Sequence, residues 1–327
     1  MRSIISGTAG FIGSRLTRKL LEYGHEIIGI DNFSLGFENK IQELKKDFPN
    51  TFFFFETDIR NLNTANPVFH SLIKSKEIEI VYHLAAQTEL TYCQNHPTEV
   101  VDININGTLN MLQLAKDVKC KRFVFMDTSA EYDSAFEFPT QEYTAPNCET
   151  PMGFYAITKM AASQFVRAWT YENRIGSTLF RPFNVCGPGQ NIIRDVPPVM
   201  GAFANKILNK EAPIIFGDGS KRRDYIHVDD MIELLIYARE NGDVYSHTFN
   251  AGTGKAYSVL EIYEFVSEYI FGDNRHLWIN PIYKENKPHE AQLTLADMTK
   301  TENHFNWKPK KTIHDMVKDT VESLRKR

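Results

Sequence analysis

The sequence predicts an α/β fold, with a doubly wound parallel sheet and a smaller C-terminal α/β domain. In the first half of the 327 residues, short runs of β-branched and aromatic residues alternate with longer segments of helical period. Strands separated by helices cannot be hairpin neighbours, so they pair in parallel through right-handed crossovers, with helices on both faces. The predicted strands are residues 3–6, 26–30, 51–56, 78–83, 122–126 and 177–183.

The regular alternation ends near residue 184. Before it, Ile12, Leu16 and Leu20 lie on one face of a helix predicted over residues 12–22. After it, residues 186–190 and 217–220 are rich in turn formers, and a strand over 247–251 is predicted to return to the main sheet. We therefore expect one domain of residues 1–183, with a returning segment at about 224–252, and a second of residues 184–223 and 253–327.

Composition excludes several classes of function. Hydrophobic residues make up 42% of the chain and charged residues 24%, with a formal net charge of −4, as in an ordinary globular protein. No basic patch predicts nucleic-acid binding, and no run approaches the roughly 20 apolar residues that cross a membrane. The four cysteines have no metal-ligand spacing and no secretory segment is recognisable. We expect reduced thiols, no metal and a cytoplasmic location.

Three glycines follow the first predicted strand at the entry to the first helix. Gly7, Gly10 and Gly13 are spaced three apart, with Phe11 and Ile12 between the last two. A strand that turns sharply into a helix presents unpaired N–H groups and a positive dipole end, and small residues let a diphosphate approach them. Tight turns also need glycine for structural reasons, so the position between strand and helix is what predicts a dinucleotide site.

Acidic residues after the second and third strands predict which dinucleotide binds. Asp31 lies 18 residues beyond Gly13, close to the ~20 expected of a carboxylate that bonds the adenosine ribose hydroxyls. Its charge repels a 2′-phosphate, so we predict NAD and not NADP. The alternative is that Asp31 only caps the next turn with Asn32, which is also a candidate contact. Asp58 and Ile59 are candidates for the adenine edge, and an ordinary turn is an equal alternative for Asp58.

A tyrosine and a lysine four residues apart predict an acid/base site. Tyr155 and Lys159 share one face of a helix predicted over residues 154–169. A neighbouring ammonium lowers the pKa of a phenol, ordinarily ~10, toward the working range. Thr128 and Ser129 follow the fifth strand, at the sheet edge where ligands gather. A surface pair and a turn cap are the alternatives, and the glycine loop upstream favours catalysis.

With its further motifs, the chain resembles the sugar-nucleotide epimerase/dehydratase family of the extended short-chain dehydrogenase/reductase superfamily. These motifs lie at residues 83–86, 104–108, 181–188, 217–220, 223–229, 250–252, 296–297 and 306–309. The resemblance implies a Rossmann domain with a small substrate domain, tightly held NAD, and a catalytic triad of Thr128, Tyr155 and Lys159. It adds four cofactor-binding residues: Leu84, Ala85, Ala86 and Asn104.

The resemblance also implies the substrate and the partner. Asn184 and Arg223 match positions that hold the diphosphate of a nucleotide-sugar, to which amide and guanidinium donors are suited. Thr128, Ser129 and Lys287 match further substrate contacts. Many epimerases have an arginine at the position of Lys287. A guanidinium can donate two parallel hydrogen bonds to one anionic group, whereas the lysine ammonium is a single point charge. The family usually dimerises, so helices over about 101–116 and 155–169 imply a four-helix homodimer interface.

The residues after Thr128 discriminate between the reactions of the family. Dehydration needs carboxyl groups at the positions of Ser129 and Ala130, and neither side chain can replace a general acid or base. The sequence therefore favours a 4-epimerase of a UDP-hexose or similar nucleotide-sugar, acting through a transient 4-keto-sugar in polysaccharide biosynthesis. The alternative is a 4,6-dehydratase or a 4-dehydrogenase, in which Glu131 would be the acid/base. A catalytically silent NAD-binding regulatory protein is the alternative of another class.

Overall fold

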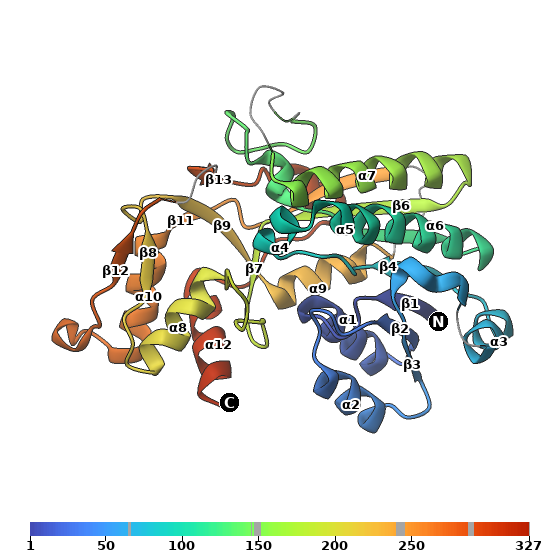
Figure 1. The fold of residues 1–327 in the computed structure, drawn as a ribbon, viewed down its shortest axis with the longest axis horizontal. Coiled ribbons are helices and arrows are strands. Elements are labelled where there is room, and N and C mark those ends of the chain that lie inside the picture. The colour runs from blue at the N-terminus through green and yellow to red at the C-terminus, as the bar shows by residue number, and fades with distance from the viewer. Residues whose placement is uncertain (65–66, 145, 147–151, 240–245, 287–290, 327) are drawn as a thin grey trace. The chain divides into compact units, whose positions relative to one another are not determined.

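Seven strands of the described chain form one sheet in the computed structural model of the protein (Figure 1). The structure describes residues 1–64, 67–144, 146, 152–239, 246–286 and 291–326. The strand order is β10-β6-β5-β4-β1-β2-β3, and the pairings from β6 to β3 are all parallel. The strands are β1 (Arg2–Ser6), β2 (Glu26–Asp31), β3 (Phe52–Glu56), β4 (Ile80–His83), β5 (Arg122–Met126), β6 (Gly176–Pro182) and β10 (Ser246–Ala251).

The strand order confirms the predicted doubly wound sheet. β2 and β3 lie on one side of β1, and β4, β5 and β6 lie on the other, so the winding reverses between β1 and β4. Ligands of open α/β sheets bind at the carboxyl ends of strands at such a reversal. Helices α1 and α2 cover one face, and α4 to α7 cover the other (Figure 1). These helices, with α3, are α1 (Phe11–Glu22), α2 (Glu38–Asp47), α3 (Pro67–Ser75), α4 (Leu90–Asn95), α5 (Pro97–Val101), α6 (Gly107–Asp117) and α7 (Phe154–Glu172).

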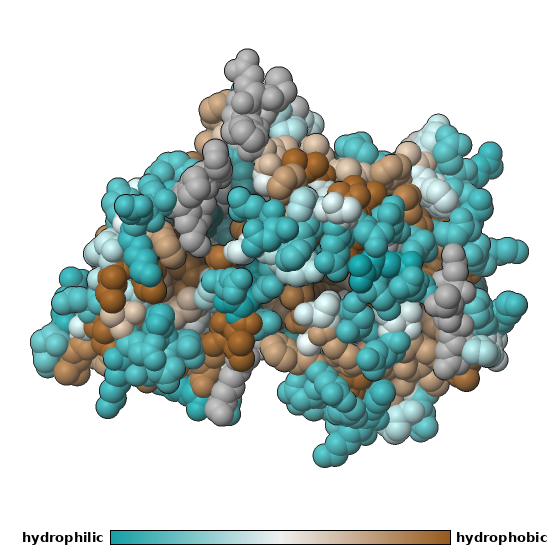
Figure 2. Space-filling model, in the orientation of Figure 1, coloured by the Kyte–Doolittle hydropathy of each residue, from teal (hydrophilic) through white to brown (hydrophobic). Residues whose placement is uncertain are grey.

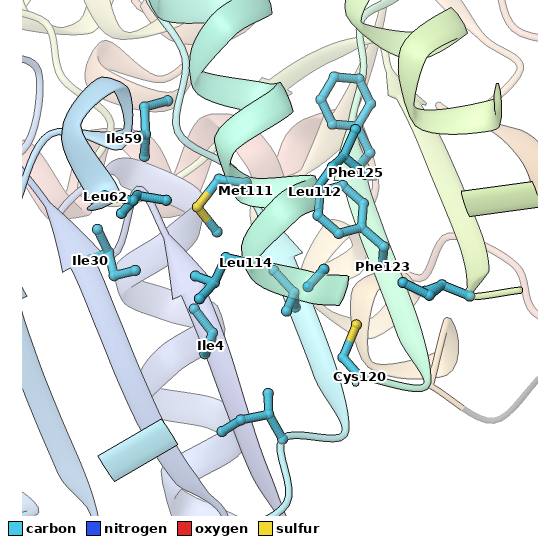
Figure 3. Packing of buried hydrophobic residues seen from close by; sticks show 14 of the residues in the cluster. Ile4, Ile30, Ile59, Leu62, Met111, Leu112, Leu114, Cys120, Phe123 and Phe125 are labelled. Carbon is cyan, nitrogen blue, oxygen red and sulfur yellow. The ribbon is translucent and has the colours of Figure 1, made fainter. Parts of the chain in front are cut away.

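Apolar side chains between the sheet and α6 form the main core (Figure 3). Met111 and Leu112 of α6 belong to one buried cluster with Ile4 of β1, Ile30 of β2 and Phe123 of β5. All five are fully buried. Burying each such side chain contributes about 1.5–3 kcal/mol, so this packing holds α6 firmly on the strands.

The helix predicted over residues 101–116 is interrupted by a wider turn. The structure has α5, then a π-helical turn over Asp102–Asn106, then α6. Within this stretch the hydroxyl of Thr108 donates to the carbonyl oxygen of Asn104 at 2.6 Å. The spacing of apolar residues, close to 3.6 residues per turn, does not reveal a single π-helical turn. The sequence therefore predicted one regular helix.

The chain divides into two units by contacts between its residues. Unit 1 comprises Met1–Thr128, Gly153–Arg181 and Ile232–Phe249, and contains most of the seven-stranded sheet. Unit 2 comprises Ser129–Met152, Pro182–Met231 and Asn250–Arg327. Assigning cofactor binding to one domain and nucleotide-sugar binding to the other stays a prediction.

Unit 2 is built around β9 (Arg222–His227). This strand pairs antiparallel with β11 (Ala256–Ser258) and parallel with β7 (Asn184–Cys186) and β13 (Leu293–Thr294). β8 (Ile214–Phe216) and β12 (Ile282–Lys284) form a separate parallel pair. The remaining helices are α8 (Val199–Leu208), α9 (Val228–Tyr237), α10 (Val259–Phe271), α11 (Thr299–Phe305) and α12 (Ile313–Arg325). In the part of the chain that the structure describes, no helix has the length and apolarity to cross a bilayer.

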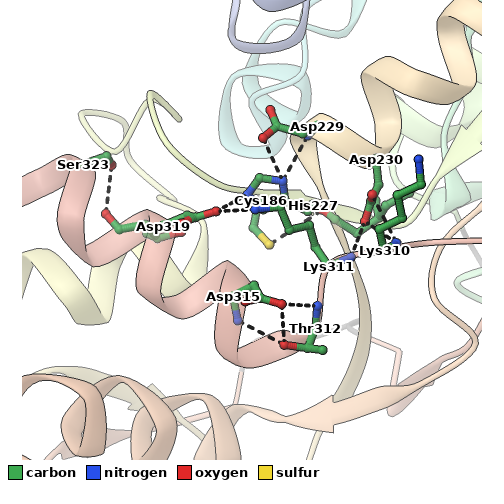
Figure 4. Close-up of polar contacts among 12 residues, drawn as sticks. Cys186, His227, Asp229, Asp230, Lys310, Lys311, Thr312, Asp315, Asp319 and Ser323 are labelled. Carbon is green, nitrogen blue, oxygen red and sulfur yellow. Dashed lines mark hydrogen bonds and ion pairs between the residues drawn. The ribbon is translucent and has the colours of Figure 1, made fainter.

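Polar contacts tie the C-terminal segment of unit 2 to the end of β9 (Figure 4). His227 is fully buried, and its Nδ1 accepts the N–H of Asp229 at 3.1 Å. The neutral ring therefore carries its proton on Nε2, which lies 3.4 Å from Oδ2 of Asp319 in α12. Lys311 donates to the same carboxylate at 3.0 Å. These contacts fix α12 to the strand that carries the predicted phosphate-binding arginine.

Candidate active site

A glycine turn follows β1. Gly7 has a φ of +77°, and a Cβ placed on it would lie 2.8 Å from the backbone nitrogen of Ala85. A Cβ on Gly13 would lie 1.9 Å from the carbonyl oxygen of Gly7. Gly10 is the N-cap of α1, where the described residues provide no side-chain cap and no acidic residue in the first turn. The N–H groups of that turn are therefore suited to a diphosphate, which the small residues allow to approach.

Other predicted cofactor contacts surround this turn. Phe11 and Ile12 are the first two residues of α1, and both are half-buried. The N–H of Leu84 donates to the carbonyl oxygen of Ser6 at 3.2 Å, and the N–H of Ala85 donates to its hydroxyl at 3.3 Å. Residues 84–86 therefore lie beside the end of β1.

Asp31 ends β2 and is largely buried. Its Oδ2 accepts the N–H of Ala9 in the glycine turn at 2.9 Å, and its Oδ1 accepts the N–H of Phe33 at 2.8 Å. Burial raises the pKa of Asp31, and these backbone hydrogen bonds oppose the rise. The carboxylate thus caps the next turn and also contacts the glycine turn. The N–H of Asn32 also bonds this carboxylate, which has about four acceptor sites, so one site is left for a hydroxyl donor.

Asp58 is held by four donors. Its Oδ1 accepts the N–H and Nε–H of Arg60 at 2.8 and 3.0 Å, and its Oδ2 accepts Nη2 of Arg60 and Nδ2 of Asn32, both at 2.8 Å. The bonds from Arg60 lower the pKa of Asp58. A carboxylate has about four acceptor sites, so this side chain is saturated. Ile59 packs against Gly107: a Cβ placed on Gly107 would lie 2.5 Å from Cδ1 of Ile59.

Asn104 connects the loop after β4 to α7. Its Oδ1 accepts the N–H of Gln87 at 2.8 Å, and its Nδ2 donates to the Gln87 carbonyl and to the Thr158 hydroxyl, both at 3.1 Å. Thr158 lies between Tyr155 and Lys159 on α7. Both amide N–H groups of this predicted cofactor residue are therefore used within the protein. Neither Gln87 nor Thr158 could be predicted as a partner of Asn104 from the sequence, because only the fold brings the three residues together.

A buried imidazole lies near a buried ammonium. The Nδ1 of His83 is 2.7 Å from the Ser6 hydroxyl, and its Nε2 is 2.9 Å from the Thr108 hydroxyl. Burial, and then the charge of Lys159, lower the pKa of His83 to about 3, so the ring is neutral at neutral pH. Lys159 is 3% exposed, with Nζ 4.0 Å from the centre of the Phe125 ring. Its charge favours the phenolate form of a nearby tyrosine.

The three residues of the predicted triad all lie in unit 1. Thr128 follows β5 and is buried, Tyr155 lies half-buried in the first turn of α7, and Lys159 lies one turn later. Helix α7 packs on β5, with Lys159 over Phe125 of that strand. Thr128 thus directly follows the strand that Lys159 contacts, and Tyr155 lies one turn before Lys159 on the same helix. A phenol near an ammonium can transfer a proton to or from a bound hydroxyl.

The residues after Thr128 enter unit 2. Ser129 opens a short 3-10 helix, Ser129–Tyr132, in which Glu131 is 4% exposed. The hydroxyl of Tyr132 donates to Oδ1 of Asn250 at 3.0 Å, which anchors this helix. Glu131 is therefore a buried carboxyl group within three residues of the predicted catalytic hydroxyl.

The predicted diphosphate residues lie on neighbouring strands of unit 2. Asn184 begins β7, and its Nδ2 donates to the carbonyl oxygen of Asp224 in β9 at 2.9 Å. Arg223 precedes Asp224, and its Nη1 donates to the carbonyl oxygen of Arg222 at 2.9 Å. Asn184 is exposed and Arg223 is half-buried, so both reach the surface of the unit. Lys287 lies outside the described residues.

Asp224 is a buried carboxylate with several hydrogen-bond donors, and its role was not predicted from the sequence. Its Oδ1 accepts the N–H and hydroxyl of Thr253 at 2.8 and 2.9 Å, and its Oδ2 accepts the N–H groups of Gly254 and Ala296 at 2.9 and 3.1 Å. These bonds fix two loops beside Arg223. In the sequence Asp224 directly follows Lys221, Arg222 and Arg223, so it reads as one of a run of surface charges and gives no signal of a buried carboxylate.

Asp224 is expected to make stability depend on pH. Burial raises its pKa to about 6 from an ordinary value of 3.8, so the folded protein takes up a proton between about pH 6 and 4 that the unfolded chain does not bind. The free energy of unfolding contributed by this group therefore increases as pH falls, by up to about 3 kcal/mol. We expect Asp224→Asn to be less stable than wild type, because its amide faces N–H donors.

Urea unfolding at pH 7 and 4.5 checks this expectation. The difference in unfolding free energy between wild type and Asp224→Asn should widen at the lower pH. Asp273→Asn, at an exposed position, is the control and should show no such widening. A constant difference for Asp224→Asn would contradict the raised pKa.

A model of the NAD dependent epimerase/dehydratase family matches residues 3–252. The chain belongs to this family. The predicted family and its NAD cofactor are thereby confirmed, and the protein is an NAD-dependent enzyme of the epimerase/dehydratase class. The glycine turn, which side chains would fill, and the buried Asp31 fit that cofactor.

Relatives of this epimerase/dehydratase family member cover its whole length. A UDP-glucuronate 4-epimerase from Thermodesulfobacterium geofontis is 31% identical, over 97% of this chain and 94% of its own. UDP-glucuronic acid decarboxylase 1 of Arabidopsis thaliana is 29% identical, over 100% and 70%. The crystal structure of UDP-glucose 4-epimerase from Thermotoga maritima with UDP-glucose has a TM-score of 0.89, 30% identity and coverage of 100% and 99%. The fold is therefore of the Rossmann type, as the resemblance implied.

Proposed function

We propose that this enzyme is a nucleotide-sugar 4-epimerase, with a UDP-hexose as its substrate class. The observation that carries the proposal is that Thr128 directly follows β5 while Tyr155 and Lys159 lie on the helix that packs on β5, in the unit that holds the glycine turn. Similarity to a UDP-glucuronate 4-epimerase and to a UDP-glucose 4-epimerase supports a UDP-sugar and C4 chemistry.

Tyr155 acts in this proposal as the base that takes the proton of the sugar C4 hydroxyl. The buried ammonium of Lys159 stabilises the phenolate, and the hydroxyl of Thr128 orients the C4 oxygen by a shared hydrogen bond. NAD, when bound, supplies the chemistry of accepting and returning a hydride. The cycle has no net redox change, because the same hydride returns to the sugar.

Inversion requires the 4-keto-sugar to present its opposite face before reduction. Asn184 and Arg223 hold the diphosphate while the hexose turns, since their donors match phosphate oxygens. Asp224 keeps the strand beside Arg223 in place through its four hydrogen bonds. Tyr155 then returns its proton to the C4 oxygen, so that the base is restored for the next cycle.

In the same proposal, each group of cofactor-binding residues contacts a different part of NAD. Gly7, Gly10 and Gly13 form the seat for the diphosphate, and Asp31 accepts the adenosine ribose hydroxyls. The negative charge of Asp31 favours NAD over NADP. Asp58, whose acceptor sites are filled, positions Asn32 at the adenosine side.

A second reaction rests on Glu131. Its buried carboxyl group follows Thr128 by three residues and could act as acid/base in a 4,6-dehydratase or 4-dehydrogenase. A decarboxylase also occurs among the relatives. Ser129 and Ala130 at the positions where dehydration needs carboxyl groups favour the epimerase.

Product analysis separates these reactions. The purified protein is incubated with UDP-, GDP-, CDP- and dTDP-sugars, and the products are followed by proton NMR. A C4-inverted sugar supports the epimerase and names its substrate. A stable 4-keto or 4-keto-6-deoxy product points to Glu131, and no turnover of any donor favours a silent NAD-binding protein.

A homodimer is part of the proposal. Exposed apolar side chains gather on helices that pack together in unit 1, and Figure 2 shows apolar residues in brown over α7. Those that are 40% exposed or more include Leu90 of α4, Val101 of α5, and Phe154, Ile157 and Phe165 of α7. In a symmetric dimer the second copy presents the same helices. A four-helix interface would therefore cover the exposed apolar side chains of both copies.

Phe165→Glu is expected to produce a monomer, because a carboxylate buried in an apolar interface loses its hydration without a partner. Light scattering should give about twice 37.6 kDa for wild type and 37.6 kDa for the variant. Val68→Glu on α3, where Val68 is 58% exposed, is the control and should stay dimeric. A monomeric wild type would contradict the interface.

A cytoplasmic location is also proposed. Cys93, Cys120 and Cys186 are free thiols and all three are buried. Free thiols are typical of proteins in reducing compartments. Fractionation of the source cells tests this location.

A further inference from the structure

A buried ion pair lies directly beside the proposed catalytic hydroxyl. Asp127 links the end of β5 to Thr128, and its Oδ2 accepts a hydrogen bond from Nε of Arg181 at 3.0 Å. The side chain of Asp127 is fully buried and that of Arg181 is 6% exposed. Both residues belong to unit 1. The chain thus places two opposite charges inside the protein one residue from its proposed active hydroxyl.

Stability alone does not account for this pair. Taking two charges out of water costs several kcal/mol each, and their attraction only roughly offsets that cost. An apolar pair of similar volume is often equally stable or more stable. Among the described residues, Oδ1 of Asp127 accepts no hydrogen bond although it is buried. The two charges therefore lower the stability of the folded state relative to an apolar pair, and this points to a role other than packing.

The pair sits where it can fix the backbone before Thr128. β5 and β6 pair in parallel, with Met126 opposite Phe180. The N–H of Asp127 donates to the carbonyl oxygen of Phe180 at 2.7 Å, so the backbone and side chain of Asp127 both bind β6. Two bonds to one strand leave the peptide that leads into Thr128 little freedom to rotate.

The proposed catalytic helix also packs on β5. Nζ of Lys159 lies 4.0 Å from the ring of Phe125, two residues before Asp127. The end of β5 is therefore held by Arg181 of β6 and contacted by Lys159 of α7. A shift of this strand end would change the distance between Thr128 and Tyr155.

We propose that Asp127 and Arg181 are a positioning pair for the reaction. They hold the strand end so that the Thr128 hydroxyl meets the substrate hydroxyl at hydrogen-bond distance while Tyr155 takes its proton. The pair acts through Thr128 and is not itself a reacting group. This inference rests on the proposed function, in which Thr128 belongs to the catalytic triad. A misplacement of about 1 Å at such a site lowers turnover by about 10²-fold.

A double-variant cycle tests the pair. Asp127→Val and Arg181→Met each remove one partner of the buried ion pair, and each should unfold at lower urea concentration than wild type. The double variant leaves no charge and should recover the wild-type urea midpoint. Its kcat should nevertheless stay about 10²-fold below wild type, with KM for the nucleotide-sugar and NAD content unchanged. Arg181→Lys keeps the charge but loses the Nε donor, so it should have an intermediate kcat.

The outcomes separate this inference from the function on which it rests. If the double variant recovers kcat together with its urea midpoint, the pair is only structural and the inference is overturned. If the double variant raises KM while kcat stays at the wild-type value, the pair acts on binding and the inference is again overturned. A wild type that inverts no nucleotide-sugar overturns the proposed function itself, and the inference with it.

Discussion

Changing Tyr155 to phenylalanine is expected to lower kcat for C4 inversion by about 10²–10⁴-fold, the usual contribution of a positioned acid/base group. The variant lacks only the phenolic oxygen, so the C4 hydroxyl has no group to take its proton. Lys159 and the glycine turn remain, and bound NAD should stay at the wild-type level. Proton NMR of the products and the absorbance of released cofactor measure both quantities.

Tyr171 supplies the matched control. It lies on the same helix and is 66% exposed, so Tyr171→Phe removes a phenolic oxygen without touching the site. That variant should turn over substrate at the wild-type rate. Equal activity of Tyr155→Phe and Tyr171→Phe would remove Tyr155 from the mechanism and direct attention to Glu131.

Gly13→Ala is expected to yield protein without bound NAD and without turnover. A Cβ at this position would lie 1.9 Å from the carbonyl oxygen of Gly7 and 2.7 Å from its carbonyl carbon. These are backbone atoms, which cannot rotate away as the end of a side chain can. The turn and the start of α1 must separate, and the proposed diphosphate seat is lost. Cofactor content after denaturation and the urea midpoint measure the effect.

Gly24→Ala distinguishes cofactor loss from the general effect of a glycine change. Gly24 has a φ of +78°, but a Cβ there meets no atom within 4 Å. This variant should lose about 1 kcal/mol of unfolding free energy from backbone strain and keep its NAD. NAD retained by Gly13→Ala at the wild-type level would place the cofactor elsewhere.

The sheet and the glycine turn could be predicted because each depends on local pattern. Apolar runs of strand length between helical segments dictate parallel strands, and the topology rules leave few arrangements of them. Gly7 and Gly13 stand out because a turn with this backbone excludes side chains. Asp31 was predicted by its distance along the chain from the turn, and the structure adds its bond to Ala9.

The supporting contacts could not be predicted, because they depend on register and on packing between distant segments. Asn104 was expected to bind the cofactor, yet both of its amide N–H groups bind Gln87 and Thr158. The bond between Arg181 and Asp127 joins residues 54 positions apart. The π turn at Asp102–Asn106 leaves no trace in the apolar period. Pattern identifies the groups that carry chemistry, but the fold decides which residues hold them in place.

The order in which the chain passes through unit 1 has a consequence for biosynthesis. Unit 1 takes up residues 1–128, 153–181 and 232–249, and β10 at the edge of the sheet lies next to β6. Once the ribosome has synthesised residue 182, six of the seven strands are complete, and β6 is still an open edge that can pair with another chain. The nascent sheet must stay in this state until residue 249 emerges, several seconds later at about 5–20 residues per second. Chaperones should therefore bind the nascent chain during that interval.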